Sequence, residues 1–356
     1  MRERLQSIVK KRGVLVLSDK WKQLITQWDG INQQLLDLMN ERARMAAEIV
    51  QEKNKQGISQ AEPVGNQQLL KELAAHSLVN PEIKKEAPAE RKLLVSRQHK
   101  SEDTVIQVNH TKIGGSSPII VAGPCSIESR DQLLTVASAM RNAGITVLRG
   151  GAYKPRTSPY DFQGLGEEGL EIMKEVADET GMVTISEIMS PMHIDTAARY
   201  IDIFQIGARN MHNFDLLKAV GQTQKPVLLK RGLSATLEEF VFAAEYLLSS
   251  GNNQVMLIER GIRTYEKWTR NTLDISAVPI LKQETHLPVL VDVTHATGRK
   301  DIMLPCAKAA LAAGADGIMV EVHPNPQVAL SDAKQQLNLD EFHTFLQGLR
   351  DSGLYR

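Results

Sequence analysis

The sequence predicts an α/β protein, in which a (β/α)₈ barrel follows a helical N-terminal domain. After residue 117, eight short runs of apolar and β-branched residues recur at even spacing, and segments with helical periodicity separate them. Strands that are apolar on both faces and alternate with helices form parallel sheets. Eight such units within roughly 230 residues fit a (β/α)₈ barrel. A doubly wound open sheet is the alternative fold.

Eight strands are expected to form the barrel. They are residues 118–125, 145–150, 182–187, 201–207, 226–231, 254–260, 288–294 and 317–323. The clearest helices are 131–143 and 301–313, each followed by a glycine, which commonly ends a helix. The alternating segment 104–115 predicts a short β-hairpin that closes the barrel floor. The open sheet is disfavoured because the first strand ends in Gly-Pro-Cys-Ser, which is not a dinucleotide-binding loop.

The N-terminal part has a different composition. Residues 1–79 are rich in Gln, Lys and Leu, with few strand signals, and predict a helical domain. Apolar residues at positions 24, 28, 31, 35, 38, 45 and 49 form a helical seam. Residues 80–103 contain two prolines and dense charge, which is typical of a linker. The barrel domain is therefore expected to span 104–356.

Composition excludes several classes of protein. Lys+Arg and Asp+Glu both number 42 among 356 residues, so no global positive field attracts nucleic acid. No apolar run reaches the roughly 18 residues that span a bilayer. Two cysteines fit a reducing compartment and exclude a disulfide framework, so we expect a cytoplasmic protein.

Charged side chains gather where the predicted strands end, which is the active-site edge of a barrel. Five of them are cations at the ends of several strands: Arg149, Lys154, Arg209, Lys230 and Arg260. Converging cations repel one another unless an anion lies among them. Arginine also binds phosphate and carboxylate through two oxygens at once. The sequence therefore predicts a ligand with several negative charges, such as a phosphorylated carboxylate.

A second set of residues has the chemistry of metal ligands, and three of its four members lie at the ends of predicted strands. It consists of Cys125, His295, Glu321 and Asp332. A thiolate, an imidazole and two carboxylates suit a divalent transition metal. The other cysteine, Cys306, lies within a predicted helix and is expected to pack in the core.

Several segments together resemble the 3-deoxy-D-arabino-heptulosonate 7-phosphate (DAHP) synthases. They include GPCSIES, LRGGAYKPRTSPYDFQGLG, IGARNMHNFDLLK, KPVLLKRG, DVTHATGR and VEVHPNP. The resemblance implies a metal-dependent condensation of phosphoenolpyruvate with erythrose 4-phosphate, the first step of the shikimate pathway. A related phosphoenolpyruvate-condensing synthase of an eight-carbon sugar acid phosphate is the alternative, and KPRTS favours the four-carbon acceptor.

The resemblance also assigns residues. It implies a divalent ion, Mn²⁺ or similar, on the four ligands named above, and the five cations as the phosphoenolpyruvate site together with Ala208. It places erythrose 4-phosphate on Lys154, Arg156, Thr157 and Ser158. The mechanism of such a condensation gives catalytic roles to Lys154, Glu187 and His295, and either Glu187 or a metal-bound group orients the attacking water. Homotetramers or homodimers are the expected assemblies.

The stretch WDGINQQLLDLMNERARMAAEIVQEKNKQG resembles the long helix of all-helical chorismate mutases. The match implies that Arg42 and Lys53 bind the substrate's carboxylates and ether oxygen. Ile25, Gly65 and Asn66 stand where that family has charged residues. The third helix of that family has no counterpart in this sequence. We therefore expect weak mutase activity or none, and a regulatory domain that senses an acid such as prephenate or chorismate. A true bifunctional synthase/mutase is the alternative.

Overall fold

The computed structural model describes residues 19–55, 92–115 and 117–355, and the chain divides into two compact units, Met1–Ala89 and Glu90–Arg356. The described part of the first unit is helix α2, Asp19–Lys55. Leu24, Ile31, Leu38 and Met45 follow one another at seven-residue intervals on this helix, and each is more than half exposed. The side chains of Arg42 and Lys53, and all of Gly65 and Asn66, lie outside the described residues.

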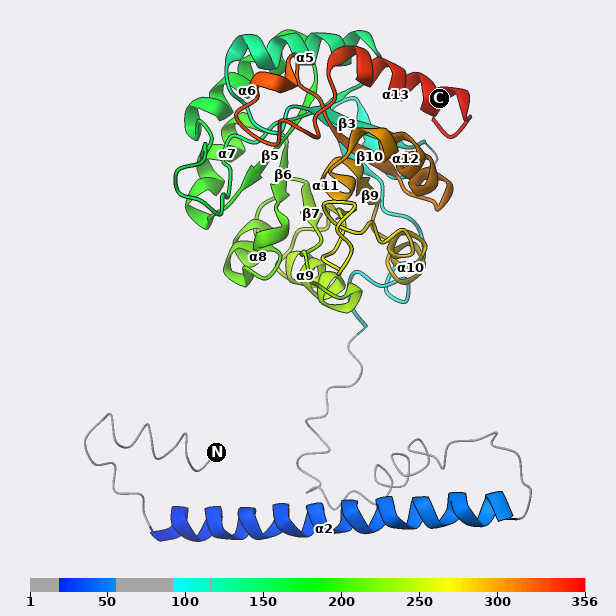
Figure 1. The fold of residues 1–356 in the computed structure, drawn as a ribbon. Helices are drawn as coiled ribbons and strands as arrows, with labels where there is room; N and C mark the ends of the chain where they lie inside the picture. Colours follow the sequence, from blue (N-terminus) through cyan, green and yellow to red (C-terminus); the bar gives the residue numbers. More distant parts are fainter. Residues whose placement is uncertain (1–18, 56–91, 116, 356) are drawn as a thin grey trace. The chain divides into compact units, whose positions relative to one another are not determined.

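The second unit is a closed barrel of eight parallel strands, as predicted (Figure 1). Each strand pairs with the next along the chain, and β10 closes the ring against β3. The strands are β3 (Ile119–Gly123), β4 (Val147–Arg149), β5 (Val183–Ile188), β6 (Ile203–Ile206), β7 (Val227–Lys230), β8 (Val255–Glu259), β9 (Val289–Asp292) and β10 (Gly317–Glu321). Every one of them overlaps one of the eight expected runs.

Helices surround the strands (Figure 1). They are α5 (Arg130–Asn142), α6 (Glu167–Thr180), α7 (Ile194–Tyr200), α8 (Phe214–Gly221), α9 (Leu237–Ser249), α10 (Ala277–Glu284), α11 (Val293–Thr297), α12 (Met303–Ala312) and α13 (Leu339–Asp351). Short 3₁₀ turns are η1 (Pro191–His193), η2 (Ala208–Asn210), η3 (Lys300–Ile302) and η4 (Pro326–Val328). Outward-facing strand residues such as Leu148 and Phe204 pack against these helices in one large core.

Alternate residues of each strand face the barrel interior, because side chains on a strand alternate between its two faces. The inward rows form a separate apolar cluster that includes Val121, Val183, Leu228 and Met319. Strands β1 (Ile106–Val108) and β2 (Thr111–Ile113) make the predicted antiparallel hairpin. Its inward residues Ile106, Val108 and Ile113 join the same cluster. The hairpin thus plugs the floor with apolar side chains.

The segment just before the hairpin is bound to the barrel. Glu245 on α9 accepts hydrogen bonds from the backbone N–H groups of Leu94 and Val95, both at 3.0 Å. His286 contacts the Leu94 carbonyl and Thr104 Oγ1, both at 2.8 Å. Contacts with the barrel therefore begin about ten residues before the expected domain start at 104.

One short helix departs from the sequence prediction. The run 288–294 was expected to continue as a strand, but β9 ends at Asp292 and α11 begins at Val293. The Asp292 side chain accepts a hydrogen bond from the His295 backbone N–H at 2.9 Å, which caps the new helix. Capping thus overrides the β-branched composition of the run and turns His295 back toward the barrel mouth. Cys306 lies on α12, half-buried against the core.

Candidate functional site

The inward rows change from apolar to charged at the carboxyl ends of the strands. On six strands, a charged residue stands two positions after an inward apolar residue, at or next to the end of the strand. These charged residues are Arg149, Glu187, Lys230, Arg260, Asp292 and Glu321. Five of these six side chains are buried, and Glu187 is half-buried. The period of two therefore brings residues far apart in the sequence to one end of the barrel.

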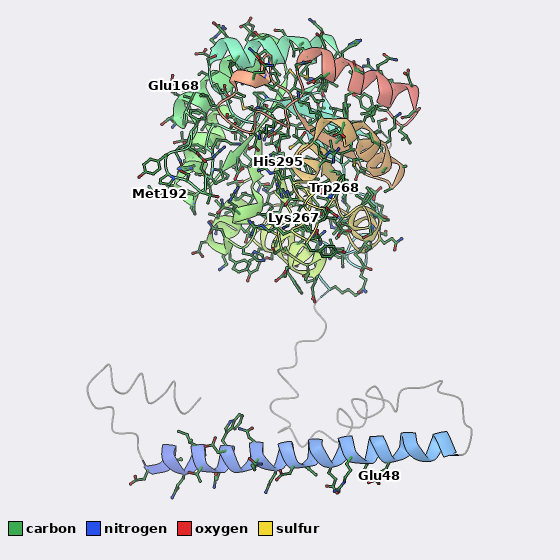
Figure 2. All side chains as sticks on the ribbon, viewed as in Figure 1. Glu48, Glu168, Met192, Lys267, Trp268 and His295 are labelled. Carbon is green, nitrogen blue, oxygen red and sulfur yellow. The ribbon has the colours of Figure 1, made fainter. Side chains whose placement is uncertain are left out.

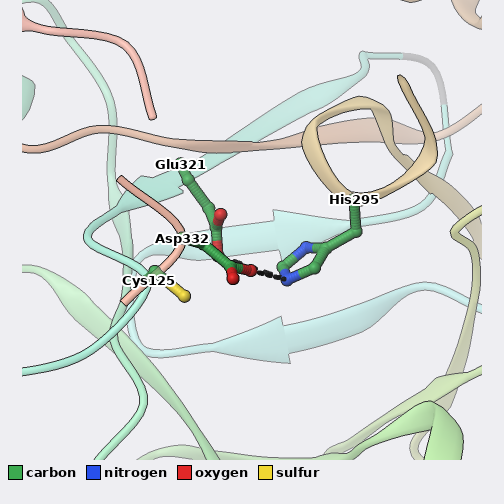
Figure 3. Close-up of side chains that lie close together, drawn as sticks. All are labelled: Cys125, His295, Glu321 and Asp332. Carbon is green, nitrogen blue, oxygen red and sulfur yellow. Dashed lines mark ion pairs between the residues drawn. The ribbon is translucent and has the colours of Figure 1, made fainter. Parts of the chain in front are cut away.

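Cys125, His295, Glu321 and Asp332 lie together at this end, and one donor atom from each falls within 4.8 Å of the others (Figure 3). His295 Nε2 is 3.4 Å from Glu321 Oε1 and 3.6 Å from Asp332 Oδ2. A divalent ion binds S, N and O donors at about 2.0–2.3 Å, so the donors that surround one ion must lie close to one another. The spacing of the four side chains therefore fits a metal site.

Burial and neighbouring charge prepare these donors for a cation. Burial lowers the pKa of His295, so the imidazole is neutral and keeps a lone pair for a ligand. Burial opposes ionisation of Asp332 and Glu321, but His295 together with Arg270 or Arg149 holds the pKa of each carboxyl below its usual range. Burial raises the pKa of the Cys125 thiol to about 11. Metal binding must therefore displace a proton from Cys125.

Two further residues support the donors, and sequence reasoning missed them. Arg270 Nη1 donates to Asp332 Oδ2 at 2.8 Å and to Gln335 Oε1 at 2.7 Å. Gln335 Nε2 donates to Glu321 Oε2 at 2.8 Å and to Asp332 Oδ2 at 3.1 Å. Neither residue ends a strand, so their place at the site follows only from the folded loops. Asp332 itself has a φ of 44°, a left-handed conformation that few non-glycine residues adopt.

A cavity of about 380 Å³ opens beside the four donors. Four of the five predicted cations line it: Lys154, Arg209, Lys230 and Arg260. The fifth, Arg149, is buried, where it donates to Glu321 Oε1 at 3.0 Å and to the Pro124 carbonyl at 2.7 Å. Ala208, Arg263 and Arg270 also line the cavity, which is therefore strongly cationic.

Lys154 connects the cavity with the donor set. Its Nζ lies 3.0 Å from Cys125 Sγ and 3.1 Å from the Cys125 carbonyl oxygen. Burial opposes protonation, but the neighbouring Cys125 and Glu321 outweigh it and raise the pKa of Lys154. Lys154 is therefore an ammonium ion at neutral pH and can donate a proton.

The KPRTS segment forms part of the cavity wall. Arg156 and Thr157 line the cavity, and Arg156 pairs with Asp161 at 3.2 Å. Ser158 accepts a hydrogen bond from the Tyr160 backbone N–H at 3.2 Å and is not among the lining residues described. Arg156 and Thr157 therefore present their side chains to the cavity, whereas the Ser158 side chain stabilises the loop itself.

Glu187 also lines the cavity, and its carboxylate is only half used. Oε2 accepts from Gln205 Nε2 at 3.2 Å, whereas Oε1 is buried and has no hydrogen-bond partner among the described residues. A Cβ on Gly207 would lie 2.0 Å from Oε1, so any other residue at this position would displace the carboxylate. Because Glu187 lines the cavity and one of its oxygens has no partner among the described residues, its carboxylate can accept a hydrogen bond from a water molecule or a substrate hydroxyl.

Figure 2 labels His295, which belongs to the donor set, within the barrel unit. Met192 in η1 and Trp268 on a loop are 88 % and 81 % exposed. Fold and site together define a (β/α)₈-barrel enzyme with a candidate metal site of mixed donors beside a cationic cavity. Residues 97–354 match the DAHP synthetase I family. The chain belongs to this family.

Individual relatives agree with that assignment. A phospho-2-dehydro-3-deoxyheptonate aldolase of Thermotoga maritima is 54 % identical over 257 residues, which cover 72 % of this chain and 76 % of that protein. A crystal structure of the DAHP synthase of Thermotoga maritima superposes with a TM-score of 0.72 and 53 % identity, over 74 % of this chain and 78 % of that one. A 2-dehydro-3-deoxyphosphooctonate aldolase of Desulfosudis oleivorans is 32 % identical over 69 % of this chain and 94 % of that protein. No helix in the described ranges is long and apolar enough to cross a membrane.

Proposed function

We propose that this chain catalyses the metal-dependent condensation of phosphoenolpyruvate with erythrose 4-phosphate. The observation that carries the proposal is the joint presence of four metal donors within 4.8 Å and a cationic cavity beside them, in a member of the DAHP synthetase I family. An assay with both substrates, run with and without a chelator, tests it directly.

The cavity supplies separate partners for the two charged ends of phosphoenolpyruvate. Arg209 and Arg260 are assigned to the phosphate, because a guanidinium binds two oxygens at once. Lys230 is assigned to the carboxylate, and Arg149 adds positive charge from beneath the cavity. Arg156, Thr157 and Ser158 are assigned to the phosphate of erythrose 4-phosphate. Replacing Arg209 or Arg260 with Ala should raise the KM for phosphoenolpyruvate and lower turnover together.

The acceptor aldehyde must become more electrophilic, because an enol carbon is a weak nucleophile. A divalent ion on Cys125, His295, Glu321 and Asp332 would supply Lewis-acid polarisation of the aldehyde oxygen. Lys154 is assigned as the general acid that protonates this oxygen while the carbon–carbon bond forms. The closeness of Lys154 Nζ to the donor set supports this role.

Carbon–carbon bond formation leaves cationic character on C2 of phosphoenolpyruvate, and water then adds there. Glu187 is assigned to orient that water and accept its proton, because it lines the cavity and its Oε1 has no hydrogen-bond partner among the described residues. Phosphate then leaves from the hemiketal, and Arg209 and Arg260 stabilise its charge. A Glu187→Gln variant should therefore lose turnover with little change in KM.

The alternative acceptor is a five-carbon sugar phosphate, which would give an eight-carbon acid. The 32 % identity with 2-dehydro-3-deoxyphosphooctonate aldolases keeps this acceptor worth testing. The 54 % identity with the heptonate enzyme and the KPRTS loop favour erythrose 4-phosphate. Competition between arabinose 5-phosphate and erythrose 4-phosphate, measured as kcat/KM, distinguishes the two.

For residues 1–79 we propose association and feedback control rather than efficient chorismate rearrangement. The missing charged positions at Ile25, Gly65 and Asn66 support this proposal. A chorismate mutase assay tests it, and turnover typical of dedicated mutases would contradict it. Removal of residues 1–89 should alter oligomeric state or prephenate sensitivity and leave condensation active. The cut is placed before Leu94 and Val95 because both are bound to Glu245.

A further inference from the structure

Asp292 is the last residue of β9, and its carboxylate is fully buried at the barrel mouth. Oδ1 accepts the hydrogen bond from the His295 backbone N–H, which caps α11. Oδ2 accepts from two side chains, Lys230 Nζ at 2.6 Å and His295 Nδ1 at 2.8 Å. One carboxylate oxygen is therefore shared by two residues that belong to different parts of the site.

The contact with His295 fixes which ring nitrogen can bind a metal. An ionised carboxylate only accepts hydrogen bonds, so in the neutral imidazole the proton lies on Nδ1. Asp292 also forms an ion pair with Lys230 at 2.6 Å, and a carboxylate paired with an ammonium is in its ionised form. His295 Nε2 then keeps a lone pair and faces Glu321 at 3.4 Å and Asp332 at 3.6 Å. A carboxylate on the far nitrogen is the usual way in which a protein orients a histidine ligand.

The contact with Lys230 reaches the substrate cavity. Lys230 lines that cavity, and its side chain is only 6 % exposed. A buried ammonium needs an anion beside it, and Asp292 is its ion-pair partner in the described structure. The orientation of Lys230 toward a bound carboxylate therefore depends on the same oxygen that orients His295.

We propose that Asp292 is a positioning residue that serves the metal site and the phosphoenolpyruvate site at once, through the oxygen that Lys230 and His295 share. The proposal rests on the proposed function of the two sites. It predicts that one substitution at a residue that contacts neither ligand weakens the binding of both.

Asp316 provides a matched control at the floor of the same barrel. Its carboxylate also pairs with a lysine, Lys282, at 2.9 Å and also accepts a backbone N–H, that of Val289, at 2.7 Å. Asp292→Asn and Asp316→Asn thus make the same chemical change in similar surroundings. Of these two aspartates, only Asp292 contacts a candidate metal ligand, His295, and a residue of the cavity wall, Lys230.

The test uses the full chain, stripped of metal by a chelator and then freed of the chelator. Calorimetric titrations measure the affinity for Mn²⁺ alone, and for phosphoenolpyruvate in the absence of erythrose 4-phosphate. An Asn at position 292 has one acceptor oxygen for three donors, so Asp292→Asn should weaken Mn²⁺ binding about 10- to 100-fold. Phosphoenolpyruvate binding should weaken about tenfold. Asp316→Asn should leave both affinities within about twofold of the wild type.

If Asp292→Asn binds either ligand as tightly as the wild type does, the shared role is overturned. Asp292→Ser, which keeps a capping hydroxyl, replaces the Asn variant if that variant does not fold. Nitrogen-15 NMR of the metal-free wild type at pH 8 needs no variant: a proton on Nε2 of His295 rather than on Nδ1 also overturns the proposal. Failure of the proposed function looks different, because the wild type and Asp316→Asn would then bind neither ligand.

Discussion

The two ends of the barrel interior are built from the same strands and have opposite chemistry. At the floor, inward residues such as Ile203 and Leu290 pack against Ile106 and Ile113 of the hairpin. At the mouth, the same inward rows end in buried ions that form pairs such as Arg149–Glu321. Apolar packing stabilises without regard to exact partners, whereas buried ions must be paired or bind a ligand. The floor thus holds the barrel together, and the mouth is organised for binding.

An Asp–Lys pair with a buried carboxylate occurs at each end, and the two pairs can be compared directly. Both carboxylate oxygens of Asp316 at the floor accept hydrogen bonds from Lys282, and one of them also accepts from the Val289 backbone N–H. These contacts are all structural. Asp292 at the mouth instead connects a cavity residue and a candidate metal ligand. The same pair is a structural contact at one end and part of a binding site at the other, because its neighbours differ. Five experiments separate the two ends further.

Metal removal should give the largest effect, and only at the mouth. Chelation should abolish condensation, because the four donors would lose the ion that activates the aldehyde. Mn²⁺ or another divalent ion should restore it, and Cys125→Ala should resist restoration because a methyl group cannot bind a metal. Circular dichroism of the chelated enzyme should still show the folded barrel. Full activity in excess chelator would contradict the metal assignment.

Lys154→Met should lower kcat by about 10²–10⁴-fold, the usual contribution of general acid catalysis. The affinity for phosphoenolpyruvate should change much less, because the role of Lys154 lies in the transition state. Steady-state kinetics and calorimetry measure the two quantities separately. A loss confined to binding would make Lys154 a simple anion ligand.

Arg270→Ala should weaken metal binding about 10- to 100-fold, since Asp332 loses the guanidinium that orients it. Arg270→Lys should restore only part of this loss, because an ammonium cannot reproduce a planar fork. Competition with a fluorescent chelator measures the affinity of each variant. An unchanged affinity in Arg270→Ala would show that Asp332 is positioned by its backbone alone.

Metal affinity should rise with pH by about tenfold per unit between pH 6 and pH 9. Burial raises the pKa of Cys125 to about 11, so over this range the thiol is protonated before the metal binds and one proton is released. Titration calorimetry in buffers of different ionisation enthalpy counts the protons. In Cys125→Ser the slope should change, because a serine hydroxyl does not release its proton in the same way. A pH-independent affinity in the wild type would show that the thiolate exists beforehand.

The smallest effect is expected at the floor, and on stability alone. Burial lowers the pKa of His286, which contacts Leu94 and Thr104 in its neutral form. Its contribution to stability is therefore complete above the unfolded pKa of about 6.5 and is lost as pH falls through the lower, folded pKa. The free energy of unfolding should fall more steeply below pH 6.5 in the wild type than in His286→Gln. Both proteins should have the same KM at pH 7.5, and a raised KM in the variant would contradict the separation of the two ends.

The sequence by itself determined the barrel and the residue types at its mouth. Eight apolar runs separated by helical segments predict a parallel sheet covered by helices, and the number of units favours a closed barrel over an open sheet. Arg149, Lys230, Arg260 and Glu321 end such runs, so the strand period alone places them inside one edge. Their spacing in the chain carried the prediction, with no need for a known contact.

Only the tertiary structure decided how these residues connect. Arg270 and Gln335 reach Asp332 from loops whose course no periodicity predicts. Asp292 takes on its double contact because its carboxylate caps α11, and that helix turns His295 back onto the oxygen that Lys230 also binds. A local pattern records which side chains leave a strand on which face. The pairing of buried charges depends on distances across the barrel, which exist only when the ring is closed.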